Sequence, residues 1–281
     1  MKKFTKITVL LAVFSMLVSG AVMAWEWPWN KKDENKISTQ GSTTVLPIVQ
    51  KAAEVFMNAN PDIEVSVRGG GSGVGIAAIM DGTVDIGMAS RDIKEKEILS
   101  AKKKGVNVVG TVIARDGMAV VVHPSNPIKA ITVAQLKKIY SGEVKNWKEL
   151  GGKDDAIVCM SRDSSSGTFA VFNGIVLGKE KLRTDAVMTV SNREVAENVK
   201  NTSGAIGYVG LAFVSDALKV LPLNGVMPSD SSVGSGTYKL ARGLNLYTDG
   251  EPSGLAGKFV DFIMSSQGQK IVKEVGYTAV K

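Results

Sequence analysis

The chain has 281 residues, a formal net charge of +7 and an aromatic content of only 6%. Its basic residues are not interleaved with aromatic side chains, so the composition excludes a typical nucleic-acid-binding groove, which combines the two. The single cysteine, Cys159, excludes an internal disulfide and lies in an apolar run, where it is typical of a small buried side chain.

The first 24 residues have the pattern of a secretory signal peptide. A basic start is followed by an apolar run over 7–18 and a small-residue cleavage site at 22–24. We therefore expect removal of 1–24, export to the periplasm, and a flexible leader over 25–36. No cysteine lies near the cleavage site and no other apolar run could span a bilayer, so we expect neither a lipid anchor nor a transmembrane helix.

The next part of the chain alternates strands and helices. A strand beginning at Ile37 runs into the polar turn 41–44, and a helix follows. Residues 63–68 alternate apolar and polar side chains, as a half-buried strand does, and a third strand covers 84–89. A charged helix over 94–104 completes this βαβαβα series.

Two crossings divide the rest of the chain into two lobes. Apolar strands at 106–113 and 118–122 lead out of the first αβ series, a loop is expected over 228–237, and a strand over 240–247 returns the chain. We therefore predict an α/β fold with two lobes, each a mostly parallel sheet flanked by helices, joined by a two-strand hinge. The first lobe comprises 37–114 and 241–281, and the second comprises 115–240.

Four hydroxyl-rich turns follow strand ends in this pattern, at 41–47, 69–75, 89–92 and 161–168. The clearest, 161–168, contains Arg162 and a run of serines before Gly167, and it is typical of a strand, turn and helix. Such a turn presents free backbone N–H groups at the positive end of a helix, beside a guanidinium, which suits an oxyanion. One such turn alone is as typical of an ordinary N-cap, but all four share this chemistry, so we predict one anion site between the lobes. Its expected residues are Ser42, Thr43, Thr44, Ser72, Gly73, Ser90, Arg91, Arg162, Ser165, Ser166, Gly167 and Thr168.

Five motifs carry a resemblance to a known family. They are 41–47 (GSTTVLP), 69–73 (GGGSG), 85–91 (DIGMASR), 161–168 (SRDSSSGT) and 204–210 (GAIGYVG). Over nearly all of residues 37–281 the chain resembles the substrate-binding proteins of bacterial phosphate ABC transporters, which have the type II periplasmic-binding-protein fold. The resemblance implies capture of inorganic phosphate and docking on an inner-membrane permease with a cytoplasmic ATPase. It also implies ligand positions at Thr43, Thr44, Ser72, Arg162, Ser166, Gly167 and Thr168.

One position departs from the family pattern. In the best-known branch of the family a carboxylate follows the Ala-Ser of the third turn and accepts the proton of hydrogen phosphate, which rejects fully ionised sulfate. This chain has Arg91 there, which is expected to add a donor and to remove that discriminator. Rejection of sulfate then needs a carboxylate elsewhere. Asp163 beside Arg162 is one candidate, although pairing with Arg162 or capping the helix is an equally good role for it.

Other functions fit the sequence less well. The stretch 73–78 satisfies Gly-x-Gly-x-x-Ala, a dinucleotide-binding pattern, but it leaves the other turns unexplained. A serine hydrolase needs a base, and the only histidine, His123, precedes a proline near a crossing strand. No Cys, His, Asp or Glu cluster has metal-ligand spacing, so we expect no cofactor and no metal.

We therefore predict a monomeric solute-binding protein, not an enzyme, that captures inorganic phosphate. Binding of another tetrahedral oxyanion, such as sulfate, molybdate or a phosphonate, and a phosphatase-like activity remain the alternatives. An anion that touches both lobes only when they are closed would favour the closed form.

Overall fold

The computed structural model describes residues 35–281, and the predicted signal peptide and nearly all of the predicted leader lie outside this range. The first part alternates strands and helices, as predicted, and Pro61 follows the end of the first helix. Its elements are β1 (Lys36–Gly41), α1 (Leu46–Ala59), β2 (Glu64–Arg68), α2 (Ser72–Met80), β3 (Ile86–Ala89) and α3 (Glu95–Lys103).

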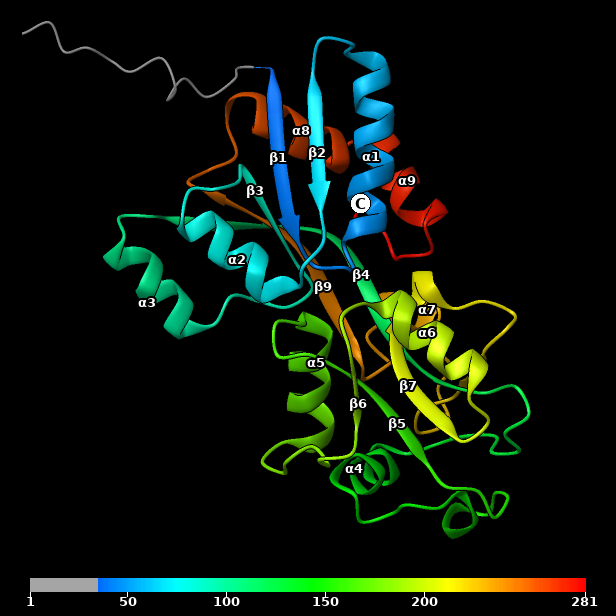
Figure 1. Ribbon diagram of the computed structural model, residues 1–281. Coiled ribbons are helices and arrows are strands. Elements are labelled where there is room, and N and C mark those ends of the chain that lie inside the picture. The colour runs from blue at the N-terminus through cyan, green and yellow to red at the C-terminus, as the bar shows by residue number, and fades with distance from the viewer. Residues whose placement is uncertain (1–34) are drawn as a thin grey trace, which may run out of the picture. The chain divides into compact units, whose positions relative to one another are not determined.

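Two long strands, β4 (Val108–Val122) and β9 (Ala241–Asp249), run between the two parts of the fold (Figure 1). They pair antiparallel, with a register irregularity between Val112 and Ala114. The apolar pattern predicts two separate strands where the structure has the single strand β4. The strand is continuous because residues 114–117 pair with β9 and therefore keep an extended backbone.

After β4 the chain forms a second αβ series. Its elements are α4 (Val133–Ser141), η2 (Trp147–Leu150), β5 (Val158–Arg162), α5 (Gly167–Phe172), η3 (Asn173–Leu177), β6 (Val187–Thr189), α6 (Asn192–Asn201), β7 (Ala205–Gly210), η4 (Leu211–Phe213), β8 (Lys219–Leu221) and α7 (Asp230–Gly234). The chain ends with α8 (Gly254–Met264) and α9 (Ser266–Glu274), which follow β9. The predicted loop over 228–237 thus contains the short helix α7, because Ser229 caps it by accepting a hydrogen bond from the backbone N–H of Ser232.

The strands form one hydrogen-bonded path in the order β2-β1-β3-β9-β4-β7-β5-β6, with β8 paired to β4. Pairing is parallel among β1, β2 and β3 and again among β5, β6 and β7. It is antiparallel wherever β4 or β9 takes part. The sheet is therefore mixed, with parallel strands on each side of an antiparallel centre.

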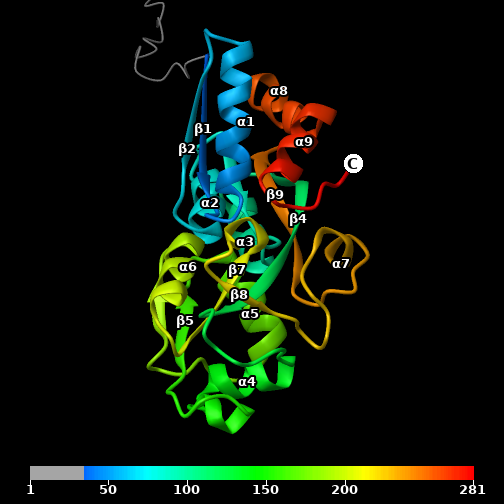
Figure 2. The same cartoon turned by 90° about the vertical axis from the view of Figure 1, so that its right-hand side faces the viewer.

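Separate cores stabilise the two sides of this centre. On one side, α1, α8 and α9 cover one face of the strands and α2 covers the other (Figure 2). On the other side, α4 and α5 pack on one face and α6 on the opposite face. We call residues 37–114 with 241–281 the first lobe and 115–240 the second lobe; these boundaries themselves stay a prediction. Among the helices within 35–281, none is long and apolar enough to cross a membrane.

Candidate anion-binding site

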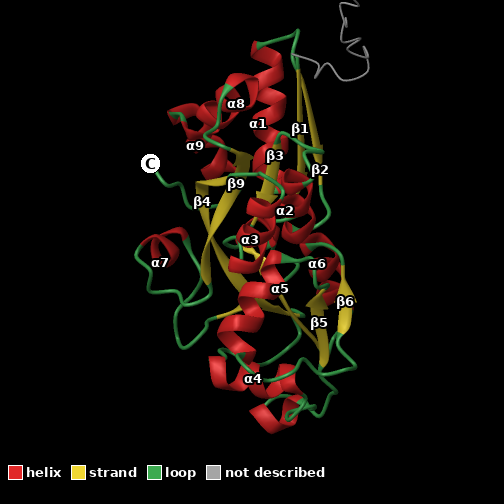
Figure 3. Ribbon diagram, turned by 90° about the vertical axis from the view of Figure 1, so that its left-hand side faces the viewer, coloured by secondary structure: helices red, strands yellow, loops and turns green. Residues whose placement is uncertain are grey.

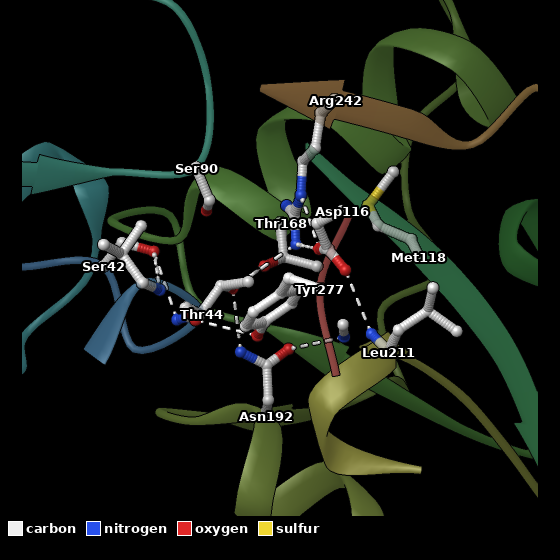
Figure 4. Close-up of polar contacts among 12 residues, drawn as sticks. Ser42, Thr44, Ser90, Asp116, Met118, Thr168, Asn192, Leu211, Arg242 and Tyr277 are labelled. Carbon is white, nitrogen blue, oxygen red and sulfur yellow. Dashed lines mark hydrogen bonds and ion pairs between the residues drawn. The ribbon is translucent and has the colours of Figure 1, made fainter. Parts of the chain in front are cut away.

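Residues from the two lobes meet at the turns that follow β1 and β5. The hydroxyl oxygens of Thr44 and Thr168 lie 3.1 Å apart, and both side chains are buried. Arg162 donates a hydrogen bond from Nη2 to Thr43 Oγ1 over 3.3 Å. Two turns that are far apart in sequence therefore form one polar cluster (Figure 4).

The turns after β2 and β3 bring two more hydroxyl groups to this cluster. Ser90 donates its backbone N–H to Ser72 Oγ over 3.0 Å, and the two hydroxyl oxygens lie 3.3 Å apart. Gly167 of the second lobe faces both serines, since a Cβ at this position would lie 2.2 Å from Ser72 Oγ and 2.7 Å from Ser90 Oγ. Glycine therefore allows the start of α5 to approach α2 this closely; the two helices lie near each other in Figure 3.

The start of α5 adds backbone donors to the cluster. Ser166 is the N-cap of this helix and accepts a hydrogen bond at Oγ from the backbone N–H of Phe169 over 3.2 Å. The N–H groups of Gly167 and Thr168 belong to the first turn, where a helix provides no acceptor for them. Hydroxyl groups and first-turn N–H groups from two lobes thus gather in one place.

Arg162 supplies the positive charge of the cluster. Its side chain is 1% exposed, and its Nε and Nη2 atoms donate to the carbonyl oxygens of Thr189 (3.2 Å) and Val190 (2.9 Å). Burial lowers the pKa of the Arg162 guanidinium, because a dry site disfavours the charged form. Its Nη1 atom is buried without a hydrogen-bond partner among the described residues. A buried cationic donor of this kind is suited to an anionic acceptor.

Three of the predicted site residues have other partners. The hydroxyl of Ser42 accepts hydrogen bonds from the backbone N–H of Thr44 (3.2 Å) and of the next residue (3.4 Å), which is a capping role. The N–H of Gly73 donates to the carbonyl oxygen of Ser165 over 2.9 Å, and the hydroxyl of Ser165 donates to the carbonyl oxygen of Gly70 over 3.0 Å. The contacts of Gly73 and Ser165 join the two lobes directly, whereas those of Ser42 stay within its own turn.

Arg91 also has another partner in the structure. Its guanidinium makes a bidentate pair with Glu97, at 2.7 and 2.8 Å, and donates to the carbonyl oxygen of Asp92 over 2.9 Å. The side chain is therefore held at the start of α3, and a contact of Arg91 with an anion stays a prediction. Asp163 holds the turn before α5, since its Oδ1 accepts hydrogen bonds from the N–H and the hydroxyl of Ser165, while Ser166 is the N-cap of the helix.

The remaining predicted residues are the ones that the structure brings together. They are Thr43, Thr44, Ser72, Ser90, Arg162, Ser166, Gly167 and Thr168.

Sequence reasoning missed several polar residues that hold Thr44 in place. Asn192 donates from Nδ2 to Thr44 Oγ1 over 2.9 Å, and Tyr277 donates its hydroxyl to the Thr44 carbonyl oxygen over 2.8 Å. Arg242 and Asp116, on β9 and β4, form a buried ion pair next to them. In the sequence, Asp116 and Arg242 are recognisable only as charged residues within apolar strands. Arg115 on β4 has the same pattern but is exposed, so the pattern does not identify a buried ion pair.

The ion pair joins the hinge strands to the second lobe. Arg242 donates from Nε (3.1 Å) and Nη2 (2.7 Å) to Asp116 Oδ2, and Asp116 Oδ1 accepts a hydrogen bond from the N–H of Leu211 over 3.0 Å. Burial raises the pKa of the Asp116 carboxyl, although the charge and hydrogen bonds of Arg242 act in the opposite direction. Both groups are therefore costly to bury and depend on each other.

The donor set of the cluster fits an oxyanion and does not fit a metal ion. Hydroxyl groups, backbone N–H groups and guanidinium groups dominate it, and these donate hydrogen bonds to anionic oxygen atoms. Within residues 35–281, no three His, Cys, Asp or Glu side chains gather closely enough to hold a metal ion.

Comparison with known proteins gives the family. Residues 30–267 match the family model of the PBP superfamily domain. The chain is 37% identical to the phosphate-binding protein PstS of Bacillus subtilis, over 96% of this chain and 92% of that protein. It is 33% identical to the protein SphX of Synechococcus elongatus, over 86% of this chain and 76% of that protein.

Solved structures agree with this result. A crystal structure with bound phosphate, of a Clostridium perfringens protein assigned as a phosphate ABC transporter substrate-binding protein, aligns with a TM-score of 0.82 and 36% identity. The alignment covers 88% of this chain and all of that one. A phosphate transport receptor of Vibrio cholerae aligns with a TM-score of 0.72 and 29% identity, over 86% of this chain and 99% of that one. The chain therefore belongs to the PBP superfamily and, within it, to the family of PstS phosphate-binding proteins.

Proposed function

We propose that this protein captures inorganic phosphate at the donor cluster between its lobes. The observation that carries the proposal is the meeting of Thr43 and Thr44 with Arg162 and Thr168, which brings hydroxyl groups and a buried guanidinium from both lobes together. A small tetrahedral anion has acceptor oxygen atoms on every side, so donors from opposite directions can serve it at once. The names of the relatives support phosphate as this anion.

Capture is coupled to closure of the lobes in this proposal. The turns of the first lobe and the start of α5 in the second lobe contribute donors to one anion only when they are near each other, and the 3.1 Å contact of Thr44 with Thr168 supports this proposal. An anion that contacts both lobes therefore stabilises the closed form by its differential contacts. The two strands β4 and β9 are the connection about which the lobes would move.

The closed complex then delivers phosphate to an ABC permease with a cytoplasmic ATPase. This step, export by the predicted signal peptide, the periplasmic location and a monomeric state are proposals that rest on the sequence pattern and on membership of a family of transport receptors. Pull-down of a detergent-solubilised permease complex by the phosphate-loaded protein tests the partnership.

The protein is proposed to bind phosphate without catalysis. The family is a family of transport receptors, and the cluster described above provides donors without an evident general base or metal. A phosphoester turnover assay with and without divalent metal tests this point. Steady release of phosphate that scales with protein concentration would favour a phosphatase instead.

Calorimetric titration with phosphate, followed by competition with sulfate, molybdate and a phosphonate, tests the identity of the anion. We expect phosphate to bind with one site per chain and to displace the other anions. Tighter binding of any of the others would assign that anion as the ligand. Rejecting sulfate needs an acceptor for the proton of hydrogen phosphate, which Arg91 cannot be, and the Asp163 carboxylate accepts hydrogen bonds from Ser165. The sulfate titration is therefore the most informative arm.

A further inference from the structure

Arg242 lies at the point where the two hinge strands cross from one lobe to the other. It pairs in register with Asp116 of β4, and the residue is 8% exposed. Two of its three nitrogen atoms, Nε and Nη2, donate to Asp116 Oδ2. This leaves the guanidinium fixed in one orientation, with Nη1 as its remaining donor atom.

The same guanidinium reaches the proposed phosphate site. Its Nη2 also donates to Thr44 Oγ1 over 3.3 Å, and Thr44 Oγ1 lies 3.1 Å from Thr168 Oγ1. In Figure 4 the side chain of Arg242 extends from β9 toward Thr44 and Thr168. Arg162 contacts the neighbouring Thr43 in the same way, over 3.3 Å. Two arginines therefore hold two consecutive threonines of the first lobe.

Both arginines have the same unused donor. Within the described residues, Nη1 of Arg162 and Nη1 of Arg242 are buried and have no hydrogen-bond partner. A buried donor without an acceptor is costly, and more so on a charged group. Each unused Nη1 belongs to a guanidinium whose Nη2 contacts one of two consecutive threonines, so an acceptor anion next to Thr43 and Thr44 would lie near both guanidinium groups.

The electrostatics agree with this geometry. Burial is the main cause of the lowered pKa of Arg162. The positive charge of Arg242 lowers this pKa further, because the two cations repel each other. Asp116 offsets one of the two positive charges. The carboxylates of Asp163 and Glu194 act to raise the pKa of Arg162, so the two unused donors, and not an excess of positive charge, suit this place to an anion.

We infer that Arg242 is a second guanidinium ligand of the bound oxyanion and that it donates to the anion from Nη1 while Asp116 holds its other two nitrogen atoms. This inference rests on the proposed capture of phosphate and adds a residue and a charge preference to it. A site with two guanidinium groups favours a doubly charged tetrahedral oxyanion over a singly charged one. Arg242 thus takes a role that the pairing of Arg91 with Glu97 leaves open.

Calorimetric titration of inorganic phosphate into four full-length mature proteins tests the inference: wild type, Arg242→Gln, Asp116→Asn and Arg115→Gln. Arg242→Gln is expected to weaken binding by roughly tenfold or more, since it removes a charge-assisted hydrogen bond. Asp116→Asn removes the charge that orients Arg242 but keeps the guanidinium, so its loss of affinity is expected to be clearly smaller than that of Arg242→Gln. Arg115→Gln removes an exposed charge from the same strand and is expected to bind as wild type does.

Each outcome decides the question. If Arg242 acts only through its ion pair with Asp116, then Asp116→Asn weakens binding at least as much as Arg242→Gln, and the inference is overturned. Wild-type affinity in Arg242→Gln overturns it as well. If Arg242→Gln does not fold, Arg242→Lys replaces it, because lysine keeps the charge but lacks the planar fork that donates to Asp116 and to the anion from separate nitrogen atoms. Wild-type affinity in this variant overturns the inference, and weaker binding supports it.

The pH dependence separates a ligand from a structural residue. Wild type is expected to bind phosphate more tightly above the second ionisation of phosphate than below it, and Arg242→Gln is expected to lose most of this preference. An unchanged preference in the variant contradicts the inference. Failure of wild type to bind phosphate at all would instead contradict the proposed function, so the two failures are distinguishable.

Discussion

The hydroxyl oxygens of Thr44 and Thr168 lie 3.1 Å apart although 124 residues separate them in the chain. Thr44 belongs to the turn before α1 in the first lobe, and Thr168 belongs to the first turn of α5 in the second. The contact shows that the turns predicted from separate motifs share one location. Two hydroxyl groups this close could donate side by side to the oxygen atoms of one anion in the proposed site.

Replacing Thr168 with valine tests the contribution of this hydroxyl. Valine keeps the shape of the side chain and removes the hydroxyl, so the affinity for phosphate is expected to fall by roughly tenfold, the effect of one hydrogen bond to a charged acceptor. Titration calorimetry measures the affinity. Thr111→Val on β4 is the matched control and is expected to bind phosphate as wild type does; an unchanged affinity in Thr168→Val would remove its hydroxyl from the site.

Replacing Gly167 with alanine tests how closely the lobes approach. The added Cβ would lie 2.2 Å from Ser72 Oγ and 2.7 Å from Ser90 Oγ, so α5 has to move away from the first lobe. We expect the affinity for phosphate to fall by more than about tenfold while each lobe stays folded. The control is Gly174→Ala in η3, where a Cβ meets nothing within 4 Å. Equal affinities of the two variants would mean that the approach of Gly167 to the serines is not needed for binding.

Breaking the pair of Arg91 with Glu97 tests whether Arg91 stabilises the fold or binds the anion. Both Arg91→Gln and Glu97→Gln are expected to lower the free energy of unfolding by about 1–3 kcal/mol, because each leaves a largely buried charge without its partner. Phosphate affinity is expected to change by less than about threefold in either variant, because the anion does not use this guanidinium. A large loss of affinity in Arg91→Gln alone would return Arg91 to the site.

The same pair has a pH signature. Burial opposes ionisation of Glu97, but its hydrogen bonds from Arg91 and from the Lys94 backbone, together with their charges, hold the pKa of this carboxyl below its ordinary value. A carboxyl with a lowered pKa in the folded state contributes stability above its unfolded pKa, and that stability is lost as the pH falls through the folded pKa. The stability difference between wild type and Glu97→Gln should therefore shrink in acid. A difference independent of pH would contradict this account.

The turns of the site could be predicted from the sequence, whereas its supporting residues could not. Glycine and hydroxyl residues after an apolar strand form a local signal, so the turns at 41–44 and 161–168 are recognisable without tertiary information. The ion pair of Asp116 with Arg242 depends on the pairing of β4 with β9, which joins residues 126 positions apart. Nothing local distinguishes such a charge from an exposed one.

Contacts that the local pattern does not contain also explain why the partner of Arg91 and the full length of β4 were not predicted. The carboxylate that binds Arg91 lies six residues further on in a helix start, and its reach back to Arg91 depends on the conformation of the intervening turn. The single strand β4 depends on hydrogen bonds to β9, which the apolar pattern of 106–122 does not contain. Local pattern therefore predicted the order of the elements, and non-local pairing decided the remainder.

Cys159 is predicted to be unreactive in the folded protein. Burial raises the pKa of its thiol to about 11, so almost none of the reactive thiolate is present at neutral pH. A chromogenic disulfide reagent should modify it slowly in the native state and quickly after unfolding in guanidinium chloride. Rapid modification of the native protein would mean that the strand β5 opens to solvent.

The most direct test of a phosphate site between the lobes is titration calorimetry of phosphate with Arg162→Gln beside wild type and Arg193→Gln. Arg193 is the matched control because it is exposed and follows Asn192, which contacts Thr43 as Arg162 does. We predict one site per chain in wild type and in Arg193→Gln, and a loss of roughly a hundredfold or more in Arg162→Gln with its circular dichroism spectrum unchanged. Wild-type affinity in a folded Arg162→Gln protein would contradict the account.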